Sequence, residues 1–354
     1  MELIEYRFDE VTINFDKKRV PLSGAQREKR QGEYRYYGAQ GVIDHIDDFI
    51  FDGTYLLIAE DGENLKSKKQ NIAQVVEGQF WVNNHAHIVQ GNELCNTRYL
   101  CYLLNSMDLS GYITGSAQPK LSQANLNAVI LLLPPIHVQD KIVEYLYMLD
   151  RKITINQQIN DNLQQQAQAI YTAMFIANAD PAWEQGHLSD LITVKYGKDH
   201  KKLADGIYPV YGSGGIMRYV ERPLYDKESV LIPRKGTLNN VMYVNQPFWS
   251  VDTMFYTEMR LPNVAKFVYH FVKAKDLASM NAGSAVPSMT TDILNAMEVV
   301  IPPASALEEF ETLVAPMYRA MQENDAQSKK LADLRDALLP KLMSGEIDVS
   351  GIQL

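Results

Sequence analysis

Two patterns of apolar and polar residues alternate along this 354-residue chain. The first is a series of short apolar runs separated by turn residues, and it fills residues 1–135 and again about 179–303. Such runs predict strands. They are Tyr55–Ala59, Phe80–Val82 and Ala86–Val89 in the first stretch, and Ser229–Ile232, Val241–Val244 and Met254–Thr257 in the second. Arg98–Asn105 and Ala265–Ala274 have helical spacing instead, so we expect two helices that pack on the sheets.

The second pattern follows each of two Pro-Pro pairs and is a heptad seam, with apolar or small residues at alternating steps of four and three. This spacing is typical of a helix that packs along another helix. The first seam is Ile142, Leu146, Leu149, Ile153, Leu163, Ala167, Ile170 and Met174, and the second is Phe310, Val314, Met317, Met321, Leu331, Arg335, Leu338 and Leu342. Only Arg335 interrupts the apolar series. Each helix is expected to span about 38 residues, roughly 57 Å long.

Both seams become polar at the same height, with Asn156 and Asn160 in the first and Asn324 and Ser328 in the second. A buried amide needs a partner, so a slipped alignment of the two helices would lose the pairing. We therefore predict an antiparallel pair of helices held together by Leu149, Ile153, Asn156, Asn160, Leu163, Met317, Met321, Asn324, Ser328 and Leu331. The alternative is that each helix lies on its own globular part with the polar positions exposed.

The whole layout occurs twice. Gly115-Ser-Ala-Gln-Pro119, Leu126-Asn-Ala128 and Pro134-Pro135 return, at a constant offset of 168, as Gly283-Ser-Ala-Val-Pro287, Leu294-Asn-Ala296 and Pro302-Pro303. Solenoid repeats span only about 20–50 residues, so this is a duplicated half-molecule. The predicted fold is α+β, with two strand-rich α/β domains (1–135 and 179–303), two long antiparallel coiled-coil helices (136–178 and 304–354) and a pseudo-two-fold internal repeat.

Composition and charge narrow the class of protein. The 46% hydrophobic and 22% charged content is that of an ordinary globular chain, and no apolar run approaches the roughly 20 residues of a membrane span. Residues 1–20 carry charges throughout, so we expect no signal peptide and a cytoplasmic protein. The only cysteines, Cys95 and Cys101, predict neither a disulfide framework nor a zinc site. The net charge of −9 argues mildly against nucleic acid as a partner, although a local basic patch can still bind phosphate.

The chain resembles the specificity (S) subunits of type I restriction-modification systems over essentially its whole length. The resemblance rests on the duplication and on Gly283-Ser-Ala-Val-Pro-Ser-Met, Pro302-Pro303, Tyr211-Gly-Ser-Gly-Gly215, Leu231-Ile-Pro-Arg-Lys-Gly-Thr237 and Leu338-Leu-Pro-Lys-Leu-Met-Ser-Gly-Glu-Ile. It implies two target-recognition domains that each read one half of a bipartite double-stranded DNA target. It also implies that the two helices set the spacer between the half-sites and dock two methyltransferase subunits.

The same resemblance implies that the chain itself has no cofactor. Adenine-N6 methyltransferase activity, with its S-adenosylmethionine, would reside in the partner methyltransferase subunits, and endonuclease activity in a restriction-translocase subunit of the full complex. The competing hypothesis is a structural or protein-interaction scaffold with two related binding heads, which the acidic composition favours.

Candidate DNA contacts are the basic and amide residues on turns between the predicted strands. Lys and Arg bind phosphate, and Arg, Lys, Asn and Gln also read base edges. The candidates are Arg27, Lys29, Arg30, Lys66, Lys68 and Lys69 in the first half, and Lys198, His200, Lys201, Lys202, Arg218, Arg234, Lys235, Asn239 and Asn240 in the second. Taken singly, each charge is more often a solvated surface residue.

No catalytic or metal site is expected. Adenine methyltransferases carry Asn or Asp before a Pro-Pro-aromatic motif, whereas Leu133 and Ile301 precede the Pro-Pro pairs here. No glycine-rich S-adenosylmethionine loop follows a strand, and the sequence contains no Glu-x-Lys of the common metal nucleases. His85 and His87 fall on one face of a strand, but no paired carboxylate motif accompanies them, so they do not predict a metal site.

Overall fold

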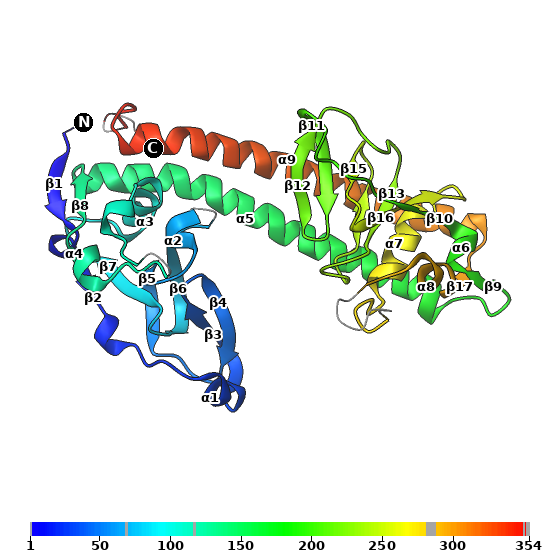
Figure 1. Cartoon of the computed structure of the whole chain (residues 1–354), viewed down its shortest axis with the longest axis horizontal. Coiled ribbons are helices and arrows are strands. Elements are labelled where there is room, and N and C mark those ends of the chain that lie inside the picture. The colour runs from blue at the N-terminus through cyan, green and yellow to red at the C-terminus, as the bar shows by residue number, and fades with distance from the viewer. Residues whose placement is uncertain (1, 68–69, 116–117, 281–287, 350, 352–354) are drawn as a thin grey trace. The chain divides into compact units, whose positions relative to one another are not determined.

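The computed structural model describes residues 2–67, 70–115, 118–280, 288–349 and 351. The chain forms two compact units, Met1–Ile155 with Ala326–Leu354, and Asn156–Asp325. The boundary falls inside both long helices, so each unit contains one strand-rich head and part of each helix (Figure 1). Below, residues 1–135 are the first head and residues 179–303 the second head. The bounds of the four segments expected from the sequence stay a prediction.

The first head is built on a six-stranded sheet with the order β2-β7-β5-β6-β3-β4. Its strands are β2 (Thr12–Asn14), β3 (Gln31–Gly38), β4 (Gly41–Ile46), β5 (Phe51–Ala59), β6 (Ala73–Val82) and β7 (Ala86–Gly91). Neighbouring strands are antiparallel except β3 and β6, which run parallel. The separate ladder of β1 (Ile4–Arg7) and β8 (Ile130–Leu133) is antiparallel. The strands predicted in this head lie in β5, β6 and β7 and are confirmed.

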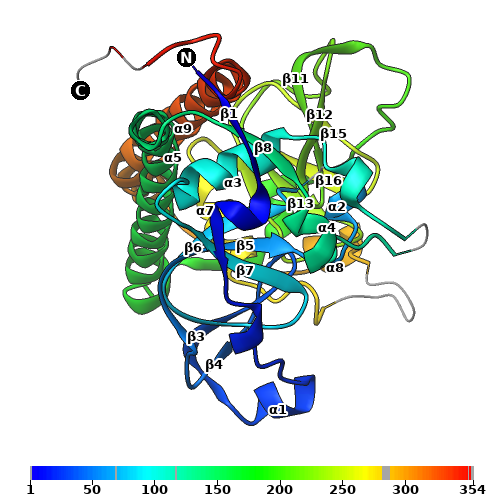
Figure 2. The ribbon, with the colours of Figure 1, turned by 90° about the vertical axis from the view of Figure 1, so that its left-hand side faces the viewer.

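Helix α3 (Thr97–Ser106) joins this sheet to the long helices, and it is the helix expected at Arg98–Asn105. The Asn96 side chain caps it by accepting hydrogen bonds from the backbone N–H groups of Arg98 and Tyr99. Figure 2 shows α3 between the sheet and the long helix α5 (Ile136–Thr172). The second long helix is α9 (Ala304–Met343). One hydrophobic core contains Tyr99, Leu100, Leu103 and Leu104 of α3, Leu56 and Ile58 of β5, Val138, Ile142 and Leu146 of α5, and Leu342 of α9. The short helices of this head are α1 (Gly24–Glu28), α2 (Asn64–Ser67) and α4 (Gln123–Asn127).

The second head contains a four-stranded sheet, β10-β16-β13-β14, a three-stranded sheet, β12-β11-β15, and the antiparallel pair β17-β9. The strands are β9 (Glu184–His187), β10 (Ile192–Tyr196), β11 (Asp205–Gly212), β12 (Gly215–Val220), β13 (Ser229–Pro233), β14 (Met242–Val244), β15 (Trp249–Ser250), β16 (Met254–Met259) and β17 (Glu298–Ile301). Its helices are α6 (Leu188–Leu191), α7 (Ala265–Lys273) and α8 (Thr291–Asn295). The predicted strands and the predicted helix at Ala265–Ala274 are confirmed.

The two heads share the same strand register. Tyr37 pairs with Val42 in the β3–β4 hairpin, and Tyr211 pairs with Ile216 in the β11–β12 hairpin, an offset of 174. Both hairpins carry register shifts at the same two places. In both, the first strand also pairs in parallel with a tryptophan-bearing strand, β6 or β15. The duplication read from the sequence is therefore a duplication of structure, and the predicted α+β fold class is confirmed.

The long helices are α5 (Ile136–Thr172) and α9 (Ala304–Met343), and each begins directly after a Pro-Pro pair. The carbonyl of Pro135 accepts hydrogen bonds from Val138 N and Gln139 N, and that of Pro303 from Ala306 N and Leu307 N. Proline suits this position because the first N–H groups of a helix have no partner within the helix. No helix in the described part of the chain is long and apolar enough to cross a membrane.

Within each unit the two helices run antiparallel. In the second unit Asn160 contacts Asp325. Phe175, in the π-helical turn Ala173–Ala177 that continues α5, packs edge-to-face against Phe310, earlier in α9, with ring centroids 5.2 Å apart. In the first unit the C-terminal end of α9 lies beside the start of α5 (Figure 1), where Leu342 and Leu146 share a core. The seam residues Leu149, Ile153, Leu163, Met317, Met321, Leu331 and Ser328 are each half-buried.

The polar gap in the seam is a hydrogen-bonded layer in the second unit. Asn160 Nδ2 donates to Met321 O (3.2 Å) and Asp325 Oδ1 (2.8 Å), and Asn324 Nδ2 donates to Asn160 Oδ1 at 2.9 Å. Asn156 Nδ2 lies 3.4 Å from Asn324 O. Burial raises the pKa of Asp325, and the hydrogen bond from Asn160 offsets part of that rise. The layer places amides of the two helices opposite one another, as a device that fixes helix register would.

A polar cluster joins each head to its helices at positions related by the 168-residue offset. In the first unit Tyr102 of α3 donates to Asp150 of α5, which also accepts from Arg335 of α9 at 2.7 Å. Arg335, the residue that interrupts the apolar seam, thus has a carboxylate partner. In the second unit His270 of α7 lies 2.9 Å from the Tyr318 hydroxyl and 2.8 Å from Gln168 Oε1.

A buried lysine adds to the second cluster. Lys266 of α7 is 4% exposed, and its ammonium lies 2.7 Å from Glu311 of α9 and 3.2 Å from Glu228. The rings of Tyr243 and Tyr318 flank it. A buried ammonium persists only when it is paired, so this cluster fixes α7 on α9.

Replacing His270 should change how stability depends on pH. Burial lowers the pKa of His270 to about 4. As the pH falls, the histidine of the unfolded chain is protonated before that of the folded chain, and this favours unfolding. The contribution of His270 to the free energy of unfolding is therefore complete above about pH 6.5 and falls by at most about 3 kcal/mol as the pH approaches 4. H270Q should flatten the fall in urea midpoint between pH 7.5 and pH 5. H137Q, at an exposed histidine of α5, is the matched control. An unchanged pH slope in H270Q would contradict this account.

Candidate nucleic-acid interface

The basic residues predicted around α1 are largely held by carboxylates of the same head. Arg27 Nε donates to Asp44 at 2.9 Å and its guanidinium lies over the ring of Tyr36. Arg30 pairs with Asp47 at 2.8 Å and lies over Trp81. Lys29 is exposed at the end of α1. Lys66 is exposed on α2, whereas Lys68 and Lys69 lie outside the described residues.

The residues predicted in the second head fall into two groups. Lys198, Lys201, Lys202 and Lys235 are exposed on loops, and His200 is half-buried between them in sequence. The others make contacts within the head that fix the loops. Arg218 donates to Leu203 O and to Asp205, Asn239 donates to Asp276, and Asn240 Nδ2 donates to Ser213 O. Arg234 donates to Asp252 O and lies over the ring of Tyr196. For every one of these residues, contact with DNA stays a prediction.

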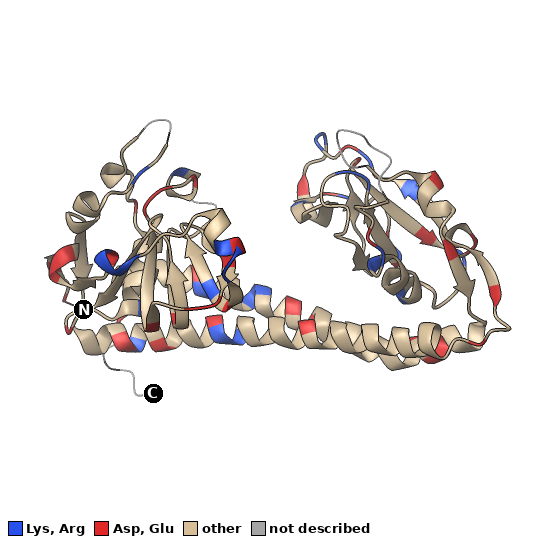
Figure 3. Cartoon of the chain, turned by 90° about the horizontal axis from the view of Figure 1, so that it is seen from below, with Lys and Arg blue, Asp and Glu red and all other residues tan. Residues whose placement is uncertain are grey.

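Acidic and basic residues are interspersed on both heads. In the view of Figure 3, Lys and Arg alternate with Asp and Glu on each head. This distribution agrees with the ion pairs of Arg27, Arg30 and Arg218. The positions of exposed lysines and of strand ends are therefore a better guide to a DNA-contacting surface than the overall charge of a head.

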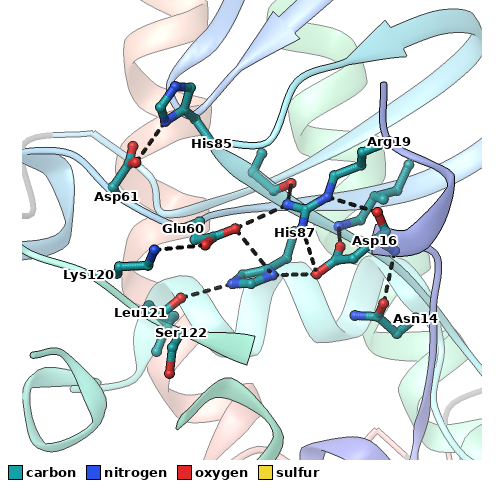
Figure 4. A network of polar contacts seen from close by, with 12 residues as sticks. Asn14, Asp16, Arg19, Glu60, Asp61, His85, His87, Lys120, Leu121 and Ser122 are labelled. Atoms are coloured by element: carbon teal, nitrogen blue, oxygen red, sulfur yellow. Dashed lines mark hydrogen bonds and ion pairs between the residues drawn. The ribbon is translucent and has the colours of Figure 1, made fainter. Parts of the chain in front are cut away.

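A polar network lies at the end of β5 in the first head (Figure 4). The Glu60 carboxylate accepts from Arg19 at 3.1 Å and lies 3.2 Å from the Lys120 ammonium. His87, only 1% exposed, has Nδ1 2.6 Å from Asp16 Oδ2 and Nε2 2.8 Å from Leu121 O. Next to this network lies the more exposed Asp61–His85 pair, with 2.7 Å between Asp61 Oδ2 and His85 Nδ1.

The buried part of this network is structural. Asp16 also accepts from the backbone N–H of Ile88 at 2.8 Å. Burial raises the pKa of Asp16, but the hydrogen bonds from His87 and Ile88 and the charge of Arg19 outweigh it, so that the pKa lies below its usual value. The sequence predicted His85 and His87 on one face of a strand, and this is wrong: His85 lies in the turn before β7 and is half-exposed, whereas His87 lies in β7 and is buried. Each is held by its own carboxylate, Asp61 or Asp16. Among the described residues, no three His, Cys, Asp or Glu side chains are grouped as metal ligands.

The backbone that supports this network is repeated in the second head. Glu60 N donates to His85 O and Arg234 N to Thr253 O, each at 2.9 Å. Leu121 N donates to Glu60 O at 2.8 Å and Met289 N to Arg234 O at 2.9 Å. Isolated bridges join Asp61 to Lys120 and Lys235 to Ser288. We call Glu60–Asp61 and Arg234–Lys235 the strand-end pairs, because they follow β5 and β13.

The chemistry on this common backbone differs between the heads. Continued two residues beyond Asn14, the β2–β7 register places Asp16 opposite His87, and the two side chains are in contact. The equivalent positions in the β10–β16 register of the second head are Tyr196 and Phe255, whose rings lie 5.0 Å apart. The strand-end pair is acidic in one head and basic in the other. The backbone is therefore shared, and the side chains that it presents are specific to each head.

Sequence reasoning missed Glu60, Asp61, Asp150 and Asp325, because it searched for basic residues and apolar seams. Asp61 could have been found by applying the 174-residue offset to Lys235, and Asp150 by asking which charge answers Arg335. The motif Gly283-Ser-Ala-Val-Pro287 lies outside the described residues, as do Ser116 and Ala117 of its first copy.

Comparisons with known proteins agree with this architecture. Residues 5–165 and 181–314 match the type I restriction modification DNA specificity domain, so both halves of the chain match one family. The chain belongs to this family, whose role is DNA recognition rather than catalysis.

Individual relatives cover most of the chain. A Haemophilus influenzae protein named as type I restriction enzyme specificity subunit S.HindORF215P is 26% identical over 358 residues, 91% of each chain. The MjaIX specificity subunit of Methanocaldococcus jannaschii is 24% identical over 301 residues, 72% of this chain and 69% of that one. The crystal structure of an S subunit from M. genitalium matches with a TM-score of 0.64 at 16% identity and covers 97% of this chain and 96% of that one.

Removing His87 should destabilise the first head. H87F leaves the buried Asp16 carboxylate without its closest partner, and we expect a loss of about 3 kcal/mol in unfolding free energy. The double variant D16Y/H87F installs the aromatic pair of the second head and should recover more than half of that loss. Urea denaturation of the three proteins measures both effects. A double variant less stable than H87F would contradict the equivalence of the two positions.

Proposed function

We propose that this chain is the non-catalytic DNA specificity subunit of a type I restriction-modification complex, in which each head reads one half of a bipartite target. The observation that carries the proposal is the repetition of one backbone framework in two heads with different side chains at equivalent positions. Two related frameworks with different surface chemistry suit two half-sites of different sequence.

We further propose that the partners are double-stranded DNA and two methyltransferase subunits, joined in the full complex by restriction-translocase subunits. Methyl transfer with S-adenosylmethionine and DNA cleavage would belong to those partners. The antiparallel segments of α5 and α9 would set the spacer between the half-sites and dock the methyltransferases. Family membership and the paired helices support this assignment. A scaffold without DNA binding is the competing reading, and salt dependence distinguishes the two.

The exposed lysines of the second head should contribute phosphate contacts. K201A/K202A is expected to weaken binding to target and non-target duplexes alike, because phosphate contacts carry no sequence information. Two lost contacts should reduce the slope of log affinity against log salt by about 2. K227A/K273A removes the same charge elsewhere in the second head and should leave the slope unchanged. A salt-independent affinity of the unaltered chain would favour the scaffold reading.

Helix length should determine spacer length. Inserting four residues after Asn156 and four after Asn324 adds about 6 Å to each helix with little net rotation, since four residues make about 1.1 turns. At about 3.4 Å per base pair, the unspecified spacer of the methylated target should lengthen by about two base pairs. Substituting Gln157 and Gln158 by alanine, with no change of length, is the control. A spacer that stays the same after the insertion would refute the proposal that helix length sets spacer length.

A further inference from the structure

The β3–β4 and β11–β12 hairpins expose the same pair of apolar positions. Val42 and Ile43 of β4 are 43% and 51% exposed, and Ile216 and Met217 of β12, at the 174-residue offset, are 49% and 61% exposed. The two strands have identical burial along their whole length. Single exposed apolar residues are common, but adjacent pairs at matching positions of two heads indicate a surface that meets a partner.

Each hairpin turn lies against the strand-end pair of its own head. In the second head Asn240, beyond the basic pair, donates to Ser213 O in the turn, and a Cβ on Gly236 would lie 2.6 Å from Ser213 Oγ. In the first head a Cβ on Gly62 would lie 3.3 Å from Gln40 Nε2 in the turn. Both glycines have positive φ, so the loop turns sharply at the hairpin. Hairpin and strand-end pair therefore form one edge in each head.

Within each strand-end pair, the second residue is the more exposed of the two. Glu60 is bound by Arg19 and Lys120, and Arg234 by Asp252 O and the ring of Tyr196. The Asp61 side chain is 22% exposed and its carboxylate lies 2.7 Å from the half-exposed ring of His85, whereas Lys235 is exposed at the surface. The same backbone thus presents a carboxylate in one head and an ammonium in the other.

A carboxylate binds hydrogen-bond donors of a base pair, whereas an ammonium binds its acceptors. In the major groove a carboxylate accepts from the exocyclic amino group of cytosine, whereas Lys donates to the O6 and N7 acceptors of guanine. An apolar pair makes contacts that do not require a particular donor or acceptor, such as those with the sugars of the DNA backbone. We therefore expect the shared apolar pair to contact features common to any DNA, and the differing charged residue to contact a base that differs between the half-sites.

We propose that this edge reads DNA bases, with Asp61, oriented by His85, accepting from a base amino group and Lys235 donating to a base acceptor edge. Val42, Ile43, Ile216 and Met217 make the contacts that both heads share. The inference rests on the proposed function and adds which residues make the two half-sites differ.

The test uses the complete chain with its methyltransferase partner and a duplex library randomised in both half-sites, read by sequencing of methylated positions. D61N should lower methylation of the natural target at least about 10-fold and relax preference at one position of one half-site only. K235M should do the same in the other half-site. D61K should shift the preferred base at its position toward guanine.

Controls separate a reading role from a structural one. D52N removes a carboxylate at the far end of β5, and K273M removes an exposed ammonium from α7; both should leave the target unchanged. D61N and K235M should keep the melting temperature and the copurifying methyltransferase of the unaltered complex. If K235M weakens all sequences equally and lowers the salt slope, Lys235 contacts phosphate and its assignment to a base edge is wrong.

The apolar pairs have their own test. V42S/I43S and I216S/M217S should each weaken DNA binding about 10-fold for every half-site sequence, while I13S, at an exposed apolar residue of β2, should have no effect. Loss of the methyltransferase with unchanged DNA binding would instead assign the hairpins to a protein contact and overturn that part of the proposal.

A complex that methylates no bipartite target would refute the proposed function. A normal target that ignores D61N, K235M and D61K would refute only this inference.

Discussion

The structure depends on cores that neither head completes alone. In the first unit, α3 and the six-stranded sheet bury their apolar faces against Val138, Ile142 and Leu146 of α5 and Leu342 and Met343 of α9. In the second, α7 and its sheet do so against Ala167 and Tyr171 of α5, Phe175 of the π-helical turn that follows it, and Leu307, Phe310 and Val314 of α9. Each head is thus closed by segments of both long helices, and burial of apolar surface supplies the main stabilisation. Most of these segments directly precede or follow their head, and only the C-terminal end of α9 is distant in sequence from the head that it closes.

At the junction between head and helix, one geometry holds two different chemistries. Tyr102, Asp150 and Arg335 form a half-buried, charged cluster in the first unit. At the equivalent places the second unit has His270 and Tyr318, with Gln168 as the further partner, and these side chains are neutral above the lowered pKa of the histidine. Lys266 replaces Arg98 and is paired with Glu311. Packing fixes the position of these residues, and each unit satisfies its buried polar groups in its own way.

The candidate nucleic-acid interface likewise combines a backbone that the two heads share with side chains that differ between them. Backbone hydrogen bonds fix the strand-end pairs identically, while the side chains on them are free to differ because they are close to the surface. A protein that reads two half-sites needs this combination, since sequence information resides in donors and acceptors and not in the scaffold that carries them. The buried His87–Asp16 pair stabilises the loop that carries the strand-end pair in the first head, and the Tyr196–Phe255 pair does so in the second.

The duplication, the strands, the paired helices and the family can all be read from the amino-acid sequence, because period-two and heptad patterns and a constant repeat offset follow directly from the order of the residues. The sequence also located the polar layer at Asn156, Asn160 and Asn324. It could not tell that Arg27, Arg30 and Arg218 pair with carboxylates, that Arg335 meets Asp150, or that Asp61 stands where Lys235 does. These points become visible in the folded chain, because the charge that a side chain presents depends on partners that the fold brings to it from elsewhere in the sequence.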